Sequence, residues 1–179
     1  MYLLVYVDDL ILTRNHEPTL RAFVTKLNEE FAIKDLGNLS YFLGLKVCYM
    51  QNGLFLHQAK YASEIIDRAS MCDCKPISTP LSTNVVLTAE GDRYSNPTLY
   101  RSLVGALQYL TITHLDISYA VNQVSQFLHC PTVTHFQELK RIIRYIKGTI
   151  THGLNFTKPK HCTLVGYSDV DWARCIDTR

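Results

Sequence analysis

The sequence lacks the features that would mark a zinc protein, a secreted protein or a membrane protein. Its six cysteines form no Cys-x-x-Cys pair and share no ligand spacing with the seven histidines, which argues against a structural zinc site. No apolar run approaches the length of a membrane span, and no basic stretch precedes an apolar core at the N-terminus. We therefore expect an intracellular protein that is not secreted and has no membrane partner. The sequence does not distinguish between cytoplasm, nucleus and mitochondrion.

A large excess of charge is also missing. The 18 basic and 16 acidic side chains leave a net charge of +2, so any attraction for nucleic acid must come from a local patch. The apolar fraction of 47% and the charged fraction of 19% are typical of a folded globular chain. A chain of 179 residues fits one domain or a domain and a fragment.

Two adjacent carboxylates, Asp8 and Asp9, lie between the apolar runs Tyr2–Val5 and Leu10–Leu12. This pattern predicts a tight β-hairpin with the carboxylates at its turn. Neighbouring carboxylates repel each other unless a cation neutralises them, and their oxygen atoms are ligands that suit Mg²⁺. The pair therefore indicates a metal site for nucleotidyl transfer. The alternative is an ordinary solvated turn, where Asp is common.

The remaining patterns predict an α+β fold, with strands clustered at both ends of the chain and helices between them. The Asn52-Gly53 pair is typical of a hairpin turn, here between the strands Tyr41–Val47 and Leu54–His57. Periodicity and capping residues predict helices at Pro18–Phe31, Ala59–Ala69, Pro97–Thr111, Asp116–Cys130 and from Thr132 to Gly148. Two further strands are expected at Gly153–Phe156 and Cys162–Tyr167.

Three cations recur at helical spacing on the last predicted helix and share one of its faces: Lys140, Arg144 and Lys147. Such a stripe can contact phosphates without reading base sequence. The alternative is a solvated outer face, with Ile142, Ile143 and Ile146 turned inward.

A series of sequence blocks resembles the reverse transcriptase of copia-type (Ty1/copia) retrotransposons over essentially the whole chain. The blocks are Tyr6-Val7-Asp8-Asp9, Lys34-Asp35-Leu36-Gly37, Tyr41-Phe42-Leu43-Gly44-Leu45, Gly53–Tyr61, Lys75-Pro76, Thr79-Pro80-Leu81, Tyr100–Leu110, Asp116–Val121, Arg144–Thr149 and Gly166–Ala173. The chain is also similar to short copia-derived open reading frames of plant genomes, including mitochondrial ones. The resemblance implies an RNA-directed DNA polymerase that uses a two-metal mechanism in the intact enzyme. Its cofactor would be Mg²⁺, and its partners dNTP and a primer–template duplex of RNA and DNA.

The resemblance also implies three regions. Residues 1–57 would be the C-terminal part of the polymerase palm with the primer-grip hairpin, and residues 58–150 a helical thumb and connection region. Residues 151–179 would be the truncated start of an RNase H-like domain. Two positions depart from the family pattern, because His114-Leu115 stand where Arg-Pro is usual and Arg174 stands where Gly is usual.

Individual roles follow from the same resemblance. Asp8 and Asp9 would be catalytic metal ligands of the polymerase, and Asp169 the first metal ligand of an incomplete RNase H site. Nucleic-acid contacts would come from Tyr6, from the primer-grip residues Phe42, Leu43 and Gly44, and from the stripe Lys140, Arg144 and Lys147.

The two-metal scheme needs carboxylates that the family supplies from upstream and downstream of this segment. We therefore expect the isolated chain to be inactive, with a missing upstream polymerase segment as a further partner. Two alternatives stay open. The chain can be a nucleic-acid-binding remnant without catalysis, or a decayed open reading frame without a selected function.

Overall fold

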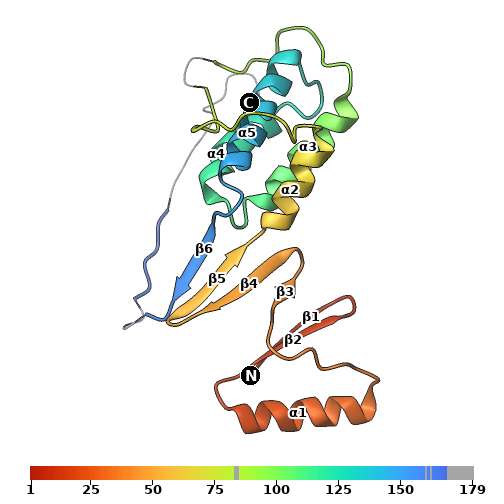
Figure 1. Ribbon diagram of the computed structural model, residues 1–179, viewed down its shortest axis with the longest axis vertical. Helices are drawn as coiled ribbons and strands as arrows, with labels where there is room; N and C mark the ends of the chain where they lie inside the picture. The colour runs from red at the N-terminus through yellow and green to blue at the C-terminus, as the bar shows by residue number, and fades with distance from the viewer. Residues whose placement is uncertain (83–84, 160, 162, 169–179) are drawn as a thin grey trace. The chain divides into compact units, whose positions relative to one another are not determined.

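The computed structural model describes residues 1–82, 85–159, 161 and 163–168, and the chain forms two compact units, Met1–Phe42 and Leu43–Arg179 (Figure 1). Both units contain helix and strand, so the mixed α and β composition expected from the sequence is confirmed. The boundary between the units lies inside the predicted palm region, residues 1–57. The assignment of the three regions to palm, thumb and RNase H stays a prediction.

The first unit consists of a hairpin, one helix and a short strand. Strands β1 (Tyr2–Tyr6) and β2 (Asp9–Thr13) pair antiparallel, helix α1 spans Glu17–Glu30, and β3 is the two-residue strand Tyr41–Phe42. Helix α1 is amphipathic as predicted, with one half-buried apolar face formed by Leu20, Phe23, Val24 and Leu27. No residue of this unit is fully buried, and β1 is exposed along its whole length.

The sheet of the second unit joins segments that lie about a hundred residues apart in the sequence. Strands β4 (Leu45–Met50), β5 (Gly53–His57) and β6 (Gly153–Thr157) pair antiparallel in that order. The predicted hairpin is confirmed, but its turn is one residue earlier than expected: Met50 pairs with Gly53, so Gln51 and Asn52 form the turn and Gly53 begins β5. The strand expected over Tyr41–Val47 is interrupted by a turn at Leu43 and Gly44, and its second part extends to Met50. The third strand brings the start of the predicted RNase H-like region onto the predicted primer-grip hairpin.

Two glycines mark the ends of the β5–β6 ladder. Gly53 pairs with Thr157, and Gly153 pairs with His57. A Cβ atom on Gly53 would lie 1.9 Å from the carbonyl oxygen of Phe156, and one on Gly153 would lie 2.2 Å from that of Leu56. Because these neighbours are backbone atoms held by the ladder, neither position accepts a side chain without loss of strand pairing.

The core of the second unit lies among its helices: α2 (Ala59–Arg68), α3 (Pro97–Leu110), α4 (Ser118–Ser125) and α5 (Val133–Gly148), with the short 3₁₀ helix η1 (Leu115–Ile117) before α4. Each helix contributes one apolar stripe to a single buried cluster. Its largest fully buried members are Tyr100, Ile65, Leu103, Leu107, Leu110, Ile117, Leu139, Ile142, Ile143 and Ile146. The inward orientation predicted for Ile142, Ile143 and Ile146 is confirmed.

Capping side chains determine where the two longest helices of this unit begin. The Asn96 side chain accepts a hydrogen bond from the Leu99 N–H at 3.0 Å, directly before Pro97. Thr132 and His135 form a reciprocal capping box, in which His135 Nδ1 accepts the Thr132 N–H at 2.9 Å. Burial lowers the pKa of His135, so the ring stays neutral and keeps this acceptor at neutral pH.

Two further predicted elements differ from the structure. The helix expected over Asp116–Cys130 begins as η1 and ends at Ser125; beyond it, Arg101 donates to the carbonyls of Leu128 and His129. The strand expected over Cys162–Tyr167 is wrong for its described residues, 163–167, which lie outside any strand; Leu164 is fully exposed there. Within the described residues, no helix is long and apolar enough to cross a bilayer.

Candidate functional site

The turn that carries the two adjacent carboxylates differs by one residue from the sequence prediction. Tyr6 pairs with Asp9, so Val7 and Asp8 form the two-residue turn and Asp9 is the first residue of β2. Val7 has a φ of 49°, in the left-handed region where a β-branched side chain is strained by about 1–2 kcal/mol. Strain of this kind concentrates at functional sites. The strained residue directly precedes Asp8, one of the two candidate metal ligands.

Asp8 and Asp9 are both exposed. Neither carboxylate has a hydrogen bond or an ion pair within the part of the chain that the structure describes, so their oxygen atoms can accept a cation. Two such carboxylates, completed by substrate phosphates, are the donors with which proteins usually hold Mg²⁺. The described residues contain no group of three or more His, Cys, Asp or Glu side chains suited to a metal ion. This hairpin therefore fits two ligands of a magnesium site.

The predicted primer-grip residues form two separate local contacts, one in each unit. In the first unit the rings of Tyr6 and Phe42 meet edge to face, with their centroids 6.4 Å apart. In the second unit Leu43 and Gly44 both have positive φ, 46° and 73°, a pattern typical of type I′ turns. The Tyr109 hydroxyl donates to the Leu43 carbonyl, a contact 66 residues apart that no sequence pattern indicated.

The cationic stripe on α5 is largely engaged within the chain. Lys147 Nζ donates to the backbone carbonyls of Cys72 and Cys74, and Arg144 Nε donates to the carbonyl of Lys75 at 2.8 Å. Lys140 differs, because it is exposed and its Nζ lies 5.3 Å from the centroid of the Phe136 ring. Two of the three cations thus hold the segment 72–75 on the helix. A role of the stripe in phosphate binding stays a prediction, and Asp169 lies outside the described residues.

Comparison with known families matches the N-terminal part of the chain. A family model described as reverse transcriptase (RNA-dependent DNA polymerase) matches residues 1–83. This range contains the hairpin with Asp8 and Asp9 as well as Phe42, Leu43 and Gly44.

Individual relatives match the whole chain. An uncharacterised mitochondrial protein of Arabidopsis thaliana is 48% identical over 179 residues, which are 100% of this chain and 75% of the relative. The retrovirus-related Pol polyprotein from transposon RE1 of the same plant is 44% identical over 97% of this chain. That from transposon TNT 1-94 of Nicotiana tabacum is 35% identical over 99%. The chain spans 12% and 14% of these two polyproteins. No solved structure matches it significantly.

Proposed function

Because the chain belongs to the reverse transcriptase family of copia-type retrotransposons, we propose that its Asp8 and Asp9 carboxylates bind Mg²⁺ for nucleotidyl transfer in the intact enzyme. The observation that carries this proposal is the pair of exposed carboxylates, without partners among the described residues, at a turn strained by Val7. In a turn that is only solvated, nothing would offset the strain of a β-branched residue at positive φ.

The chain's own residues would position the reacting groups. When bound, Mg²⁺ supplies stabilisation of the charge that develops on the phosphate oxygens during transfer. Asp8 and Asp9 would fix the ligand oxygens on a hairpin rather than on a mobile loop. The Tyr6–Phe42 ring pair holds the end of β1, and so keeps this turn in place. Positioning and electrostatic stabilisation supply most of the catalysis of phosphoryl transfer.

The turn at Leu43 and Gly44 is proposed to support the primer end through the backbone of the duplex. Tyr109 holds the Leu43 carbonyl, and a Cβ atom on Gly44 would lie 3.6 Å from the Tyr109 ring. A fixed turn without a side chain at Gly44 lets a polynucleotide backbone approach closely. Contacts to sugar and phosphate position a duplex without selecting its sequence. Asp169 is proposed, by resemblance alone, as the first RNase H ligand.

The metal proposal is tested by binding of the purified chain to an RNA–DNA primer–template with and without Mg²⁺. Binding is expected to strengthen with Mg²⁺ in the wild type and to lose this metal dependence in the double variant Asp8→Asn/Asp9→Asn, since amides neither attract nor balance the ion as carboxylates do. Fluorescence anisotropy at fixed ionic strength measures both affinities. Metal dependence that persists in the double variant would contradict the proposal and favour a remnant without metal chemistry.

The stripe on α5 is proposed to offer Lys140, rather than Lys147, to a duplex phosphate. The variant Lys140→Met should lower the slope of log affinity against log salt by about one, as expected for one lost phosphate contact. Its matched control, Lys147→Met, removes the same charge but leaves the Cys72 and Cys74 carbonyls without their donor. It should lower the free energy of unfolding by about 1 kcal/mol. Equal salt slopes for wild type and Lys140→Met would exclude the phosphate contact.

A further inference from the structure

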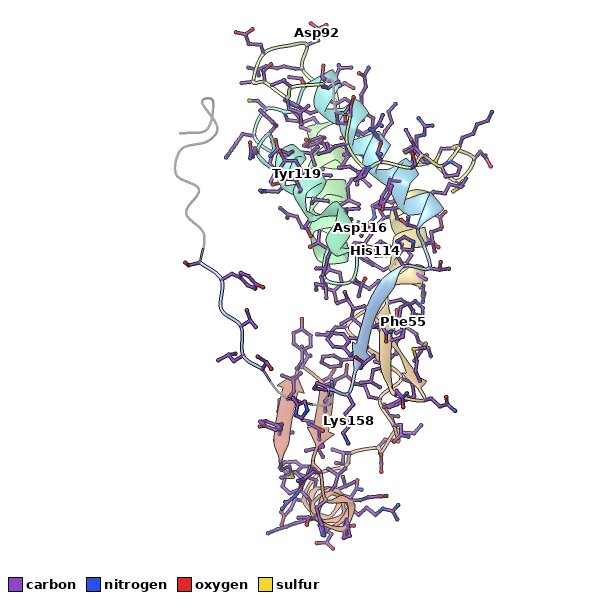
Figure 2. The ribbon with its side chains drawn as sticks, turned by 90° about the vertical axis from the view of Figure 1, so that its left-hand side faces the viewer. Phe55, Asp92, His114, Asp116, Tyr119 and Lys158 are labelled. Atoms are coloured by element: carbon purple, nitrogen blue, oxygen red, sulfur yellow. The ribbon has the colours of Figure 1, made fainter. Side chains whose placement is uncertain are left out.

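A cleft of about 520 Å³ lies in the second unit, between the β5–β6 strands and the end of the helical cluster at η1 and α5. Its apolar lining comes from Phe55, Leu115 and Leu154, and its polar lining includes Asp116, Tyr145 and His152. Figure 2 shows Phe55 on the sheet and Asp116 at η1, and both side chains line this cleft. Among the described residues no lysine or arginine lines it, so Asp116 is the charged group that they present to a ligand.

The carboxylate of Asp116 is held in place from α5. The Tyr145 hydroxyl donates a hydrogen bond of 2.5 Å to Asp116 Oδ2. This bond, together with burial and the negative charge of Asp116, raises the pKa of Tyr145 to about 12, so the hydroxyl keeps its proton at neutral pH. Within the described residues Asp116 has no other hydrogen-bond partner, and its Oδ1 atom can accept a hydrogen bond from a ligand.

Beneath the cleft, buried polar side chains hold its floor rigidly. Thr113, which lines the cleft, donates from Oγ1 to Gln58 Oε1 at 2.8 Å. His114 Nε2 donates to the Thr149 carbonyl at 3.0 Å, which joins the loop before η1 to the end of α5. These bonds hold the segment that leads into η1, and the Tyr145 hydroxyl orients the Asp116 carboxylate on it.

We propose that this cleft binds an arginine side chain of another polypeptide, with the guanidinium on Asp116 and its plane against the aromatic lining. A guanidinium offers a planar face to rings such as Phe55 and His152, and N–H donors to a carboxylate. Two exposed side chains, Leu115 at 62% in the lining and Tyr119 at 58% three residues after Asp116, provide contact area for the residues that flank such an arginine (Figure 2). This role is independent of the metal site proposed at Asp8 and Asp9.

The test is a titration of the full chain with N-acetyl-arginine methylamide, followed by the NMR signals of the Tyr145, His152 and Phe55 rings. Saturable shifts of these signals are expected. Asp116→Asn should weaken binding at least about tenfold, since a charge-assisted hydrogen bond and an ion pair are lost together. The corresponding lysine derivative should bind several-fold more weakly, because an ammonium cannot stack on the rings.

Two variants make the result specific. Asp92→Asn removes the same charge at the opposite end of the helical cluster (Figure 2) and should leave the affinity unchanged. His152→Ala removes an exposed ring of the lining and should weaken binding without disturbing the core. Equal affinity of wild type and Asp116→Asn would overturn the proposal. So would tighter binding of guanosine than of the arginine derivative, because that result would assign the cleft to a nucleobase.

Discussion

Asp8→Asn and Asp9→Asn are each expected to reduce Mg²⁺-dependent nucleotide incorporation by about 10²–10³-fold, the usual cost of removing one electrostatic stabiliser from a transition state. The assay is primer extension by a chimera in which residues 1–179 replace the matching segment of the transposon RE1 Pol polyprotein, to which they are 44% identical. With saturating primer–template the loss should appear in the rate, because the metal held by the two carboxylates stabilises the charge of the transition state.

The control for this experiment is Asp92→Asn, which changes charge equally in the second unit, far along the chain from the hairpin. It should leave incorporation within about twofold, as most surface substitutions away from a site cause little change. The chain alone is expected to give no primer extension, since two carboxylates are fewer than a two-metal site requires. Magnesium-dependent extension by the chain alone, lost in Asp8→Asn, would show that this expectation is wrong.

Leu107→Ala is expected to lower the free energy of unfolding of the helical cluster by about 2–5 kcal/mol, because Leu107 is fully buried and the substitution leaves a cavity. Such a loss is a large fraction of the stability of a domain this size. Urea denaturation followed by far-UV circular dichroism measures it as a lower midpoint.

The matched control, Leu36→Ala, makes the same chemical change where the side chain is 77% exposed. Its effect should stay within about 0.5 kcal/mol. An equally small effect of both variants, without a cooperative unfolding transition, would mean that the apolar cluster around α3 does not hold the unit together. That outcome would favour a chain that has lost the ability to fold.

The parts of the fold that local sequence determines were predicted well. Helices α2, α3 and α5 begin and end within one residue of the predicted bounds, and the side chains of Asn96 and Thr132 cap the first turns of α3 and α5. The β4–β5 hairpin is equally local, although its turn at Gln51 and Asn52 lies one residue before the predicted Asn52-Gly53 pair. The pairing of β6 with β5 was not predicted. A strand can pair with any free strand edge, and the local sequence of β6 does not indicate which edge that is. The strand expected near Tyr167 lacked such a partner among the described residues.

The candidate site shows the same division between local and distant contacts. The carboxylate pair could be found from its apolar flanks, but the register at Tyr6 and Asp9, which puts the strain on Val7, depends on backbone geometry. The hydrogen bonds of the α5 cations Arg144 and Lys147 were also not predicted, because the backbone carbonyls that accept them lie about 70 residues earlier in the sequence. A charge stripe looks alike in sequence whether it faces solvent or a neighbouring segment.

Gly53 and Gly153, at the two ends of the β5–β6 ladder, allow nucleotide substitutions to show whether this reading frame is decaying. Every change at the first or second base of a glycine codon introduces a side chain or a stop codon. At Gly53 and Gly153 that side chain would overlap a backbone carbonyl, whereas Gly105 and Gly166 have no neighbour within 4 Å. If selection maintains this fold, copies of the reading frame should change the first pair of codons far less often than the second. A gene free of selection should change both pairs at one rate.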